Sequence, residues 1–376
     1  MKILVIGSGG REHAICWKLK QSPHTSELYS SPGNAGIAEI ATCLPANVNE
    51  PNSLAALAKS IHADLTVIGP EAPLVAGVSE SFQANGLRMV GPTAAAAQLE
   101  GSKIFAKQFM ARHAIPTARF KACDSPEAAR EAFKTQFKFP VVIKADGLAA
   151  GKGVRIAQNQ SEFDDAINAM MVETVFGEAG SRVVLEKCLF GREASVMTFT
   201  DGRDYKAIVP AQDYKRVGDG DRGPNTGGMG SFSTPGLIDD AMLTRIAREI
   251  VEPTLVGMAS EGNSFSGVLY TGLMFTEDGP KVIEYNARLG DPETQAVMMR
   301  LDSDLVEIFE SIVDARVGST SISWNDESSV CVVAASGGYP GEFEKGKVVG
   351  GLDEANSIDG AVVFHAGTSL DDRGRF

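Results

Sequence analysis

Residues 140–157 read PVVIKADGLAAGKGVRIA and place a glycine-rich loop between two runs of strand-forming residues. A P-loop would require the pattern G-x-x-x-x-G-K-[ST] with a helix after it. Here only three residues separate Gly147 from Gly151, and Lys152 is followed by a glycine, which offers magnesium no hydroxyl. The small residues still let the backbone approach an anion closely. The segment therefore predicts a hairpin lid over phosphate, with Lys144 at a strand end beneath it; a plain surface hairpin is the alternative.

Residues 1–100 alternate between strand-like and helical stretches. Strands are expected at 2–6, 26–30, 64–68 and 87–90, and helices at 12–20, 53–62 and 75–83; a long alanine-rich helix at 94–112 is expected to connect this region to the next. Such alternation predicts a parallel sheet covered on both faces, with its turns at the carboxyl edge, where ligands bind. The turns in question are GSGG, SPGNAG, GPEAP and GPT.

The turn GSGGRE after the first strand only partly matches a dinucleotide-binding fingerprint. The fingerprint requires a third glycine at the position where this chain has Glu12, so NAD and FAD are disfavoured. The backbone N–H groups of Gly9, Gly10 and Arg11 at a helix start favour a phosphate or a carboxylate. A tight turn without a ligand is the alternative.

The rest of the chain predicts a two-lobe core and a short C-terminal region. Strands at 119–122, 141–145, 154–157 and 182–186 with helices at 125–135 and 161–171 indicate a small α+β lobe. Strands at 194–200, 206–210, 266–275 and 281–285 build a second sheet, and two more follow at 330–334 and 362–365. The expected domains are an N-terminal α/β domain at 1–101, a core at 102–324 with its small lobe at about 115–190, and the start of a β-rich domain at 325–376. We expect part of that last domain to be missing, because about fifty residues is few for a domain.

The composition argues against several classes of protein. The net charge is −13 and the isoelectric point about 5.0, which disfavours a nucleic-acid-binding protein. No apolar run approaches the ~20 residues of a membrane helix, and the N-terminus lacks a signal-peptide layout, so a cytoplasmic protein without a membrane partner is expected. The 5 cysteines are scattered without a C-x-x-C pair, so neither disulfides nor a zinc site is expected.

Two further segments carry carboxylates suited to nucleotide chemistry. In VIEYNARLGDPET, residues 282–294, Glu284 and Asn286 lie two residues apart in a strand and share a face, where their oxygens could hold magnesium. Glu186 and Glu193 flank a strand crossover whose backbone could pair with an adenine edge and whose carboxylates could hold ribose hydroxyls. Glu284 and Asn286, taken alone, could also be simply solvated, and the segment with Glu186 and Glu193 does not by itself decide for a nucleotide.

Together these segments resemble the glycinamide ribonucleotide synthetase family of the ATP-grasp superfamily. The resemblance spans nearly the whole chain and rests on ILVIGSGGREHA, VIGPEAPLVAG, SKIFAKQFM, VVIKADGLAAGKGV, GREAS, QDYKRVGDGDRGPNTGGMG and VIEYNARLGDPETQ. It implies an α/β N-terminal domain, a two-lobe ATP-grasp core and a small C-terminal domain. It also implies ATP with Mg²⁺ or Mn²⁺, and glycine and phosphoribosylamine as substrates joined through glycyl phosphate in de novo purine biosynthesis. The protein would act as a monomer or weak dimer.

The resemblance also assigns roles to individual residues. Lys103 and Lys144 would bind the phosphates of ATP under a lid that contains Gly147, Gly151, Lys152 and Gly153. The nucleoside would contact Glu186, Lys187, Leu189 and Glu193, and magnesium would be held by Glu284 and Asn286. The substrates would contact Gly9, Gly10, Arg11, Glu71, Asp213, Lys215, Gly227, Gly228, Arg288 and Asp291. The chemistry would depend on Lys144, Arg288 and Asp213, the last by orienting or deprotonating the attacking amine.

The chain departs from the family pattern in places. Lys187 stands where many relatives have a second glutamate, and Tyr214 stands where they have a histidine. The strand around 270–275 offers no further acid for magnesium. The alternative functions are another ATP-grasp ligase or a purine carboxylase, a nucleotide-dependent dehydrogenase, and an inactive nucleotide-binding protein.

Overall fold

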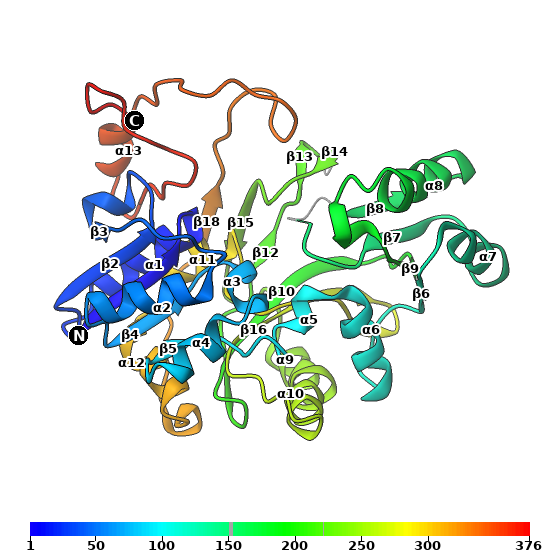
Figure 1. Ribbon diagram of the computed structural model, residues 1–376, viewed down its shortest axis with the longest axis horizontal. Coiled ribbons are helices and arrows are strands. Elements are labelled where there is room, and N and C mark those ends of the chain that lie inside the picture. Colours follow the sequence, from blue (N-terminus) through cyan, green and yellow to red (C-terminus); the bar gives the residue numbers. More distant parts are fainter. Residues whose placement is uncertain (150–152, 221) are drawn as a thin grey trace.

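The computed structural model describes residues 1–149, 153–220 and 222–376, and Figure 1 shows their arrangement. The N-terminal residues form the predicted parallel sheet, in the order β3-β2-β1-β4-β5. Its strands are β1 Lys2–Gly7, β2 Glu27–Pro32, β3 Thr42–Cys43, β4 Leu65–Ile68 and β5 Met89–Val90. Its helices are α1 Gly10–Lys20, α2 Pro51–Ser60, α3 Glu71–Val75 and α4 Val78–Ala84. No helix in the described ranges is long and apolar enough to cross a membrane.

Helices cover both faces of this sheet, because alternate residues of a strand point to opposite faces. Leu4 and Ile6 pack in the same apolar cluster as Phe82 of α4. Ile3 packs in a second cluster with Ile15 of α1. The helices α1 and α3 begin within three residues of the ends of β1 and β4, so their first turns lie at the carboxyl edge of the sheet.

The core contains two antiparallel four-stranded sheets. The small-lobe sheet has the order β6-β9-β7-β8, with β6 Phe120–Cys123, β7 Val141–Ala145, β8 Val154–Ala157 and β9 Val183–Lys187. Its helices α7 Pro126–Gln136 and α8 Gln160–Ile167 pack on it through Phe133 and Phe163 and lie at the far right of Figure 1. The larger sheet has the order β11-β10-β16-β17, with β10 Arg192–Thr200, β11 Tyr205–Ala207, β16 Gly267–Thr276 and β17 Gly279–Asn286.

Shorter elements complete the core around the larger sheet. A hairpin of β13 Arg216–Gly218 and β14 Arg222–Asn225 lies near a sheet of β12 Gln212–Asp213, β15 Gly230–Ser233 and β18 Ser329–Val332. The helices of this part are α9 Asp240–Ile246, α10 Glu252–Ser260, α11 Glu293–Met298 and α12 Leu305–Val313. The strand β18 pairs with β15, so the chain after the core begins as an extension of a core sheet.

The predicted long helix over 94–112 is two helices, α5 Gln98–Gly101 and α6 Lys103–Arg112. Ser102 between them is extended, with φ −138° and ψ 116°, and its side chain accepts from the Phe105 N–H. Serine is a preferred helix cap, because its oxygen satisfies an N–H group that has no partner within the helix. The Ser102 hydroxyl also donates to Asp146 Oδ1 at 2.7 Å, which ties the start of α6 to the end of β7.

Two other predictions differ from the structure. The GPEAP turn already begins a helix, and the predicted helix over 75–83 is interrupted by Gly77, whose φ of +91° suits glycine. Residues 362–365 are not a strand; the His365 N–H donates to His13 Nδ1 of α1 at 2.8 Å instead of to a neighbouring strand. The C-terminal residues also contain α13 Leu352–Asn356, which lies near β3 in Figure 1.

Candidate active site

A cleft of about 2320 Å³ runs between the small-lobe sheet, the larger core sheet, the carboxyl edge of the N-terminal sheet and the C-terminal residues from 325 onward. All the predicted site residues that the structure describes line this cleft, with the exception of Gly9. Gly151 and Lys152 lie outside the described residues, so their contact with phosphate stays a prediction. The cleft therefore collects the nucleotide, metal and substrate candidates from three parts of the chain.

Two lysines and one glutamate form a buried cluster where the two core sheets meet. Lys107 of α6 lies 2.8 Å from Glu186 Oε2, and Lys144 of β7 lies 3.0 Å from Glu186 Oε1. All three side chains are only 3–4% exposed. Lys107 also donates to Thr117 Oγ1 at 2.7 Å, and Lys144 donates to the carbonyl of Ile283 in β17 at 3.0 Å. The cluster thus joins α6, β7, β9 and β17.

The charges of this cluster are unbalanced, with two ammonium groups for one carboxylate. Burial lowers the pKa of Lys107 to about 8, against the attraction of Glu186. Burial tends to raise the pKa of Glu186, but the two lysines bring it below its ordinary value. Among the described residues no donor is aligned with Glu186 Oε1: Lys144 Nζ lies 3.0 Å away as an ion pair, and its aligned hydrogen bond goes to the Ile283 carbonyl. This site suits a ligand that brings a hydrogen-bond donor and negative charge together.

Lys103 is held beside this cluster by the end of β7. The Lys103 N–H donates to the Asp146 carbonyl at 2.9 Å, and Asp146 Oδ1 accepts from Ser102 Oγ and from the Ile104 N–H at 2.7 and 2.8 Å. Lys107 was not among the predicted site residues. It lies one helical turn after Lys103 in SKIFAK, and this spacing could have placed it on the same face of α6.

The glycine-rich loop closes the predicted hairpin, since Lys144 at the end of β7 pairs with Val154 of β8. The Ala145 N–H donates to the Gly153 carbonyl at 2.9 Å. A Cβ atom on Gly147 would lie 2.6 Å from the Cβ of Ala179, so this position requires glycine. The hairpin is confirmed, and its action as a lid stays a prediction.

The segment predicted to face adenine follows β9 along the cleft. Lys187 and Leu189 both line the cleft, and so does Glu193 at the start of β10. The Lys187 N–H donates to the Arg119 carbonyl at 2.9 Å and is therefore not available to a nucleotide. This chain has Lys187 where many relatives have glutamate, and this change of side chain leaves backbone contacts with a nucleotide possible.

The predicted metal pair, Glu284 and Asn286, lines the cleft from β17. Glu284 Oε1 lies 3.1 Å from Lys215 Nζ, which in turn lies 3.9 Å from Asp213 Oδ2. Lys215 lowers the pKa of Glu284 to about 2, and Glu284 raises the pKa of Lys215 well above its ordinary value. Gly272 pairs with Glu284 across the strands, and a Cβ atom there would lie 3.2 Å from Glu284 Cγ. The neighbouring strand leaves room for the carboxylate at this register.

Arg288 connects the core with the N-terminal domain through two acids. Its Nε lies 3.4 Å from Glu71 Oε2, and its Nη2 lies 2.8 Å from Glu100 Oε1. Glu100 is 4% exposed and also accepts from the Ala287 N–H at 2.7 Å. When the Asn286 amide is turned to the orientation that suits its neighbours, its nitrogen donates to Glu100 Oε1 at 2.9 Å. Burial raises the pKa of Glu100, and Arg288 opposes this effect. Glu100, which no motif indicated, thus holds Arg288 and Asn286 in place together.

A second carboxylate that sequence reasoning left without a role lies beside Asp213. Glu293 is 2% exposed, and its Oε1 accepts from the Tyr270 hydroxyl at 2.7 Å and from Ser195 Oγ at 2.9 Å. Burial and then the charge of Asp213 raise the pKa of Glu293. With Glu284 nearby on β17, the surroundings of Lys215 are rich in acids.

The first glycine turn differs from its prediction at one position. The Gly9 N–H donates to Glu12 Oε2 at 2.6 Å and is therefore not available to an anion. Arg11 Nε also donates to Glu12, at 2.6 Å from Oε1. Gly10 and Arg11 line the cleft, so the predicted anion contact narrows to these two residues. Asp291 lines the cleft as well, with its Oδ1 accepting from the Gln295 side chain at 2.7 Å.

The glycine-dense segment 223–230 is fixed by hydrogen bonds and close packing. The Thr226 N–H and Oγ1 donate to the Lys215 carbonyl at 2.7 and 2.8 Å. Gly228 has a φ of +132°, and a Cβ atom there would lie 2.4 Å from Pro292 Cδ. The Gly227 N–H donates to the Tyr339 hydroxyl at 3.3 Å. Through Thr226, this segment therefore holds the backbone of Lys215 in place.

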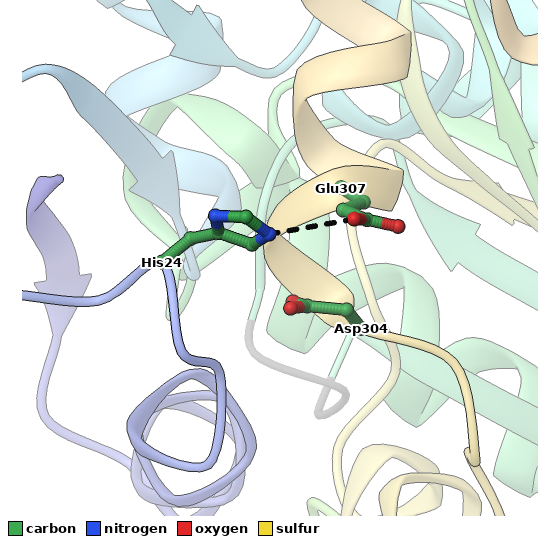
Figure 2. Close-up of side chains that lie close together, drawn as sticks. All are labelled: His24, Asp304 and Glu307. Atoms are coloured by element: carbon green, nitrogen blue, oxygen red, sulfur yellow. Dashed lines mark ion pairs between the residues drawn. The ribbon is translucent and has the colours of Figure 1, made fainter.

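A group of possible metal ligands also lies outside the cleft, where His24, Asp304 and Glu307 come together (Figure 2). His24 Nε2 lies 3.4 Å from Glu307 Oε1. Asp304 caps α12 by accepting from the Val306 N–H at 2.8 Å, and its other oxygen accepts from Ser22 Oγ at 2.7 Å. Both Asp304 oxygens already accept hydrogen bonds from the protein, so we interpret the three residues as a surface contact and not as a metal site.

Known proteins are similar to this chain in sequence and in fold. The family models of phosphoribosylglycinamide synthetase match residues 1–100 as its N domain, residues 101–294 as its ATP-grasp (A) domain and residues 329–376 as its C domain. The chain is 50% identical over 372 residues to phosphoribosylamine–glycine ligase of Brucella melitensis, covering 99% of this chain and 87% of that protein. The ligase of the same name from Caldanaerobacter subterraneus is 47% identical, covering 99% of this chain and 88% of that protein.

Solved structures agree with these matches. Phosphoribosylamine–glycine ligase from Thermotoga maritima superposes with a TM-score of 0.80 at 36% identity, covering 100% of this chain and 89% of that chain. Biotin carboxylase from Campylobacter jejuni has a TM-score of 0.68 at 19% identity over 90% of this chain and 77% of that chain, a likeness of fold alone. The chain belongs to the phosphoribosylglycinamide synthetase family.

Proposed function

We propose that the protein joins glycine to 5-phosphoribosylamine at the expense of ATP, giving glycinamide ribonucleotide, ADP and phosphate in de novo purine biosynthesis. Membership of the family and the relatives named phosphoribosylamine–glycine ligases at 47% and 50% identity support this function. The structural observation that carries it is a cleft with excess cations around Glu186 and an oxygen-donor pair, Glu284 and Asn286. Such a cleft suits ATP with a divalent cation.

ATP would lie with its phosphates toward Lys103 and Lys144 and its adenine toward residues 186–189. Glu186 Oε1 supports this orientation, because a buried acceptor without an aligned donor can accept from the exocyclic amine of adenine. The start of α6 at Lys103 adds a helix N-terminus, which favours negative charge. The glycine-rich loop that ends at Gly153 would cover the phosphates.

Glu284 and Asn286 fit Mg²⁺ or Mn²⁺ as oxygen ligands. Lys215 lowers the pKa of Glu284 to about 2, so this carboxylate is ionised at neutral pH. Asn286 donates its nitrogen to Glu100, which leaves its oxygen for a cation. A divalent cation bound there with ATP would neutralise charge on the phosphoryl group that is transferred.

The proposed reaction has two steps. The carboxylate of glycine attacks the γ-phosphorus of ATP, and ADP leaves, giving glycyl phosphate. The amine of phosphoribosylamine then attacks the acyl carbon, and phosphate leaves. Lys144 and Lys103 would neutralise charge on the phosphates, and positioning would supply most of the remaining acceleration. A closed loop would keep water away from the acyl phosphate.

Asp213 and Arg288 would act on the second substrate. Asp213 lies 3.9 Å from Lys215 and beside Glu293, and these acidic surroundings suit an amine. It would orient or deprotonate the attacking amine. Arg288, fixed by Glu71 and Glu100, would bind phosphoribosylamine together with Gly10 and Arg11. Lys215, Gly227, Gly228 and Asp291 would complete the substrate contacts.

We further infer that the protein works in the cytoplasm as a monomer or weak dimer, with small molecules and neither nucleic acid nor membrane as partners. The net charge of −13 supports the exclusion of nucleic acid. Size-exclusion chromatography with light scattering over a range of protein concentrations tests the oligomeric state.

A coupled assay of ADP release tests the proposed function. Glycine with phosphoribosylamine should release ADP, whereas bicarbonate with aminoimidazole ribonucleotide, the substrates of a purine carboxylase, should not. Glu284→Ala should lower the rate by about 10²-fold or more, because a metal ligand is lost. Glu131→Ala on the exposed face of α7 is the matched control. ADP release with the bicarbonate pair would exclude the proposed substrates, and full activity of Glu284→Ala would exclude the metal assignment.

A further inference from the structure

The buried cluster of Lys107, Glu186 and Lys144 contains one cation more than its carboxylate requires. Lys144 and Glu186 line the cleft, whereas Lys107 lies behind them and is 2% exposed. If Lys144 binds phosphate, its ammonium group is shared between the phosphate and Glu186, and the phosphate draws it away from Glu186. A buried carboxylate that loses its cation is strongly destabilised. The presence of Lys107 can therefore be explained by the need of Glu186 for a cation when Lys144 binds phosphate.

We propose that Lys107 is a positioning residue for ATP: it keeps the Glu186 carboxylate paired, so that Lys144 can turn from Glu186 to the phosphates. The proposal rests on the proposed function in so far as ATP occupies this cleft. Glu186 would then keep at least one lysine in both states: Lys107, beside the adenine amine, with ATP bound, and both lysines without ATP. Lys107 itself would touch neither ATP nor the substrates.

The contacts of the two lysines differ in the way this role requires. Lys107 Nζ donates to Thr117 Oγ1 at 2.7 Å, and Thr117 Oγ1 donates to the Val282 carbonyl of β17 at 2.7 Å. Lys107 is thus anchored by protein groups that no ligand has to displace. Lys144 stands near the end of β7 at the foot of the glycine-rich loop, where its one aligned acceptor among the described residues is the Ile283 carbonyl. Of the two, Lys144 is the one placed to move.

The charges are consistent with this division. The pKa of Lys107 is lowered by burial to about 8, so Lys107 is still mostly protonated at pH 7 and can hold Glu186 alone. The other charged groups that face Lys107 are Lys144 from β7 and Glu284 from β17. Lys144 repels Lys107, so turning Lys144 toward phosphate also relieves this repulsion.

A double-mutant cycle on Lys107 and Glu186 tests the proposal. Binding of magnesium AMP-PNP, an ATP analogue, is measured by calorimetry, so the measurement does not depend on ligase turnover. Lys107→Met should weaken binding by about tenfold or more, because Lys144 is then the only cation left for Glu186. In the Glu186→Gln background the same substitution should change binding by less than about threefold, because no carboxylate has to be held. The KM for glycine should stay within about twofold in all variants.

Several outcomes would overturn the proposal. Binding by Lys107→Met equal to that of the wild type would show that Glu186 does not compete for Lys144. An equal loss in the wild-type and Glu186→Gln backgrounds would indicate a role in packing alone. If Lys107→Met alone does not fold, the Glu186→Gln protein can still be compared with the double variant, and a loss of binding of more than about threefold between them would contradict the proposal. A wild-type protein that binds no AMP-PNP but still releases ADP with its substrates would overturn the inference alone, and one that does neither would overturn the proposed function with it.

Discussion

The two sides of the cleft carry opposite imbalances of charge. Around Glu186, two lysines face one carboxylate, and all three side chains are 3–4% exposed. Around Lys215 the acids predominate: Glu284 lies 3.1 Å away and Asp213 lies 3.9 Å away. These acids, Glu284 first, raise the pKa of Lys215 well above its ordinary value. Counted with its nearest partners, one group has spare positive charge and the other has spare negative charge; the two groups are neighbours, because Glu284 also attracts Lys107 and Lys144.

This difference explains how such a site could work with few of the usual acid–base residues. A triphosphate brings negative charge, and a metal ion or an amine brings positive charge, so each side of the cleft complements a different reactant. Fixed charges of this kind need no reorganisation during the reaction. The contrast also leads to two kinds of experiment. A change near Glu186 should spare the binding of glycine, and a change near Lys215 should spare the binding of the nucleotide.

The largest effect is expected from Lys144→Met, which removes the cleft-facing lysine of the Lys107–Glu186–Lys144 cluster. The value of kcat should fall by about 10²–10³-fold, because charge on the transferring phosphoryl group is no longer neutralised. The KM for glycine should change little. Steady-state ADP release measures both, and Lys121→Met, exposed on β6 of the same sheet, is the control. A kcat within about threefold of the wild-type value would show that this side does not serve the phosphates.

A smaller effect is expected from Asp213→Asn on the acid-rich side, which keeps the shape of the side chain and removes its charge. Turnover should fall by about 10–100-fold, because the attacking amine loses its acceptor. Binding of magnesium AMP-PNP should be unchanged, since the cation-rich side is intact. Asp219→Asn in the exposed β13–β14 hairpin is the control. Unchanged turnover would remove Asp213 from the chemistry, and weakened AMP-PNP binding would show that the two sides are not separable.

Much of the fold could be predicted because its signals are local. The alternation of strands and helices in the N-terminal domain and the turns that close the β7–β8 and β16–β17 hairpins are written in neighbouring residues. The break at Ser102 was missed because part of its cause, the hydrogen bond to Asp146, comes from another element. The contact of Glu12 with the Gly9 N–H was local, and its spacing is that of a capping box, so it could have been found.

The sequence predicted which residues line the candidate site, but it did not predict which of them form ion pairs with one another. The motifs indicated Lys144, Glu186 and Glu284 by their positions at strand ends. They could not indicate that Lys107 pairs with Glu186, or that Glu100 holds Arg288, because each partner comes from a distant part of the chain. Charge balance is a property of the folded cleft, so the contrast between its two sides appears only in three dimensions.

The smallest effect is expected from pH, and it belongs to the acid-rich side. Lys215 lowers the pKa of Glu284 from 4.5 to about 2, so the pair stabilises the fold fully above about pH 4.5 and loses this contribution as the pH falls toward 2. Because Glu284 and Lys215 are 25% and 35% exposed, we expect the contribution to be about 1–2 kcal/mol. Urea unfolding between pH 6 and pH 3 should therefore show a shallower loss of stability for Glu284→Gln than for the wild type, whereas Glu131→Gln on exposed α7 should follow the wild type. Equal slopes for all three proteins would mean that Lys215 does not hold Glu284 in solution, and the acid-rich side would then be open to a cation without displacing a lysine.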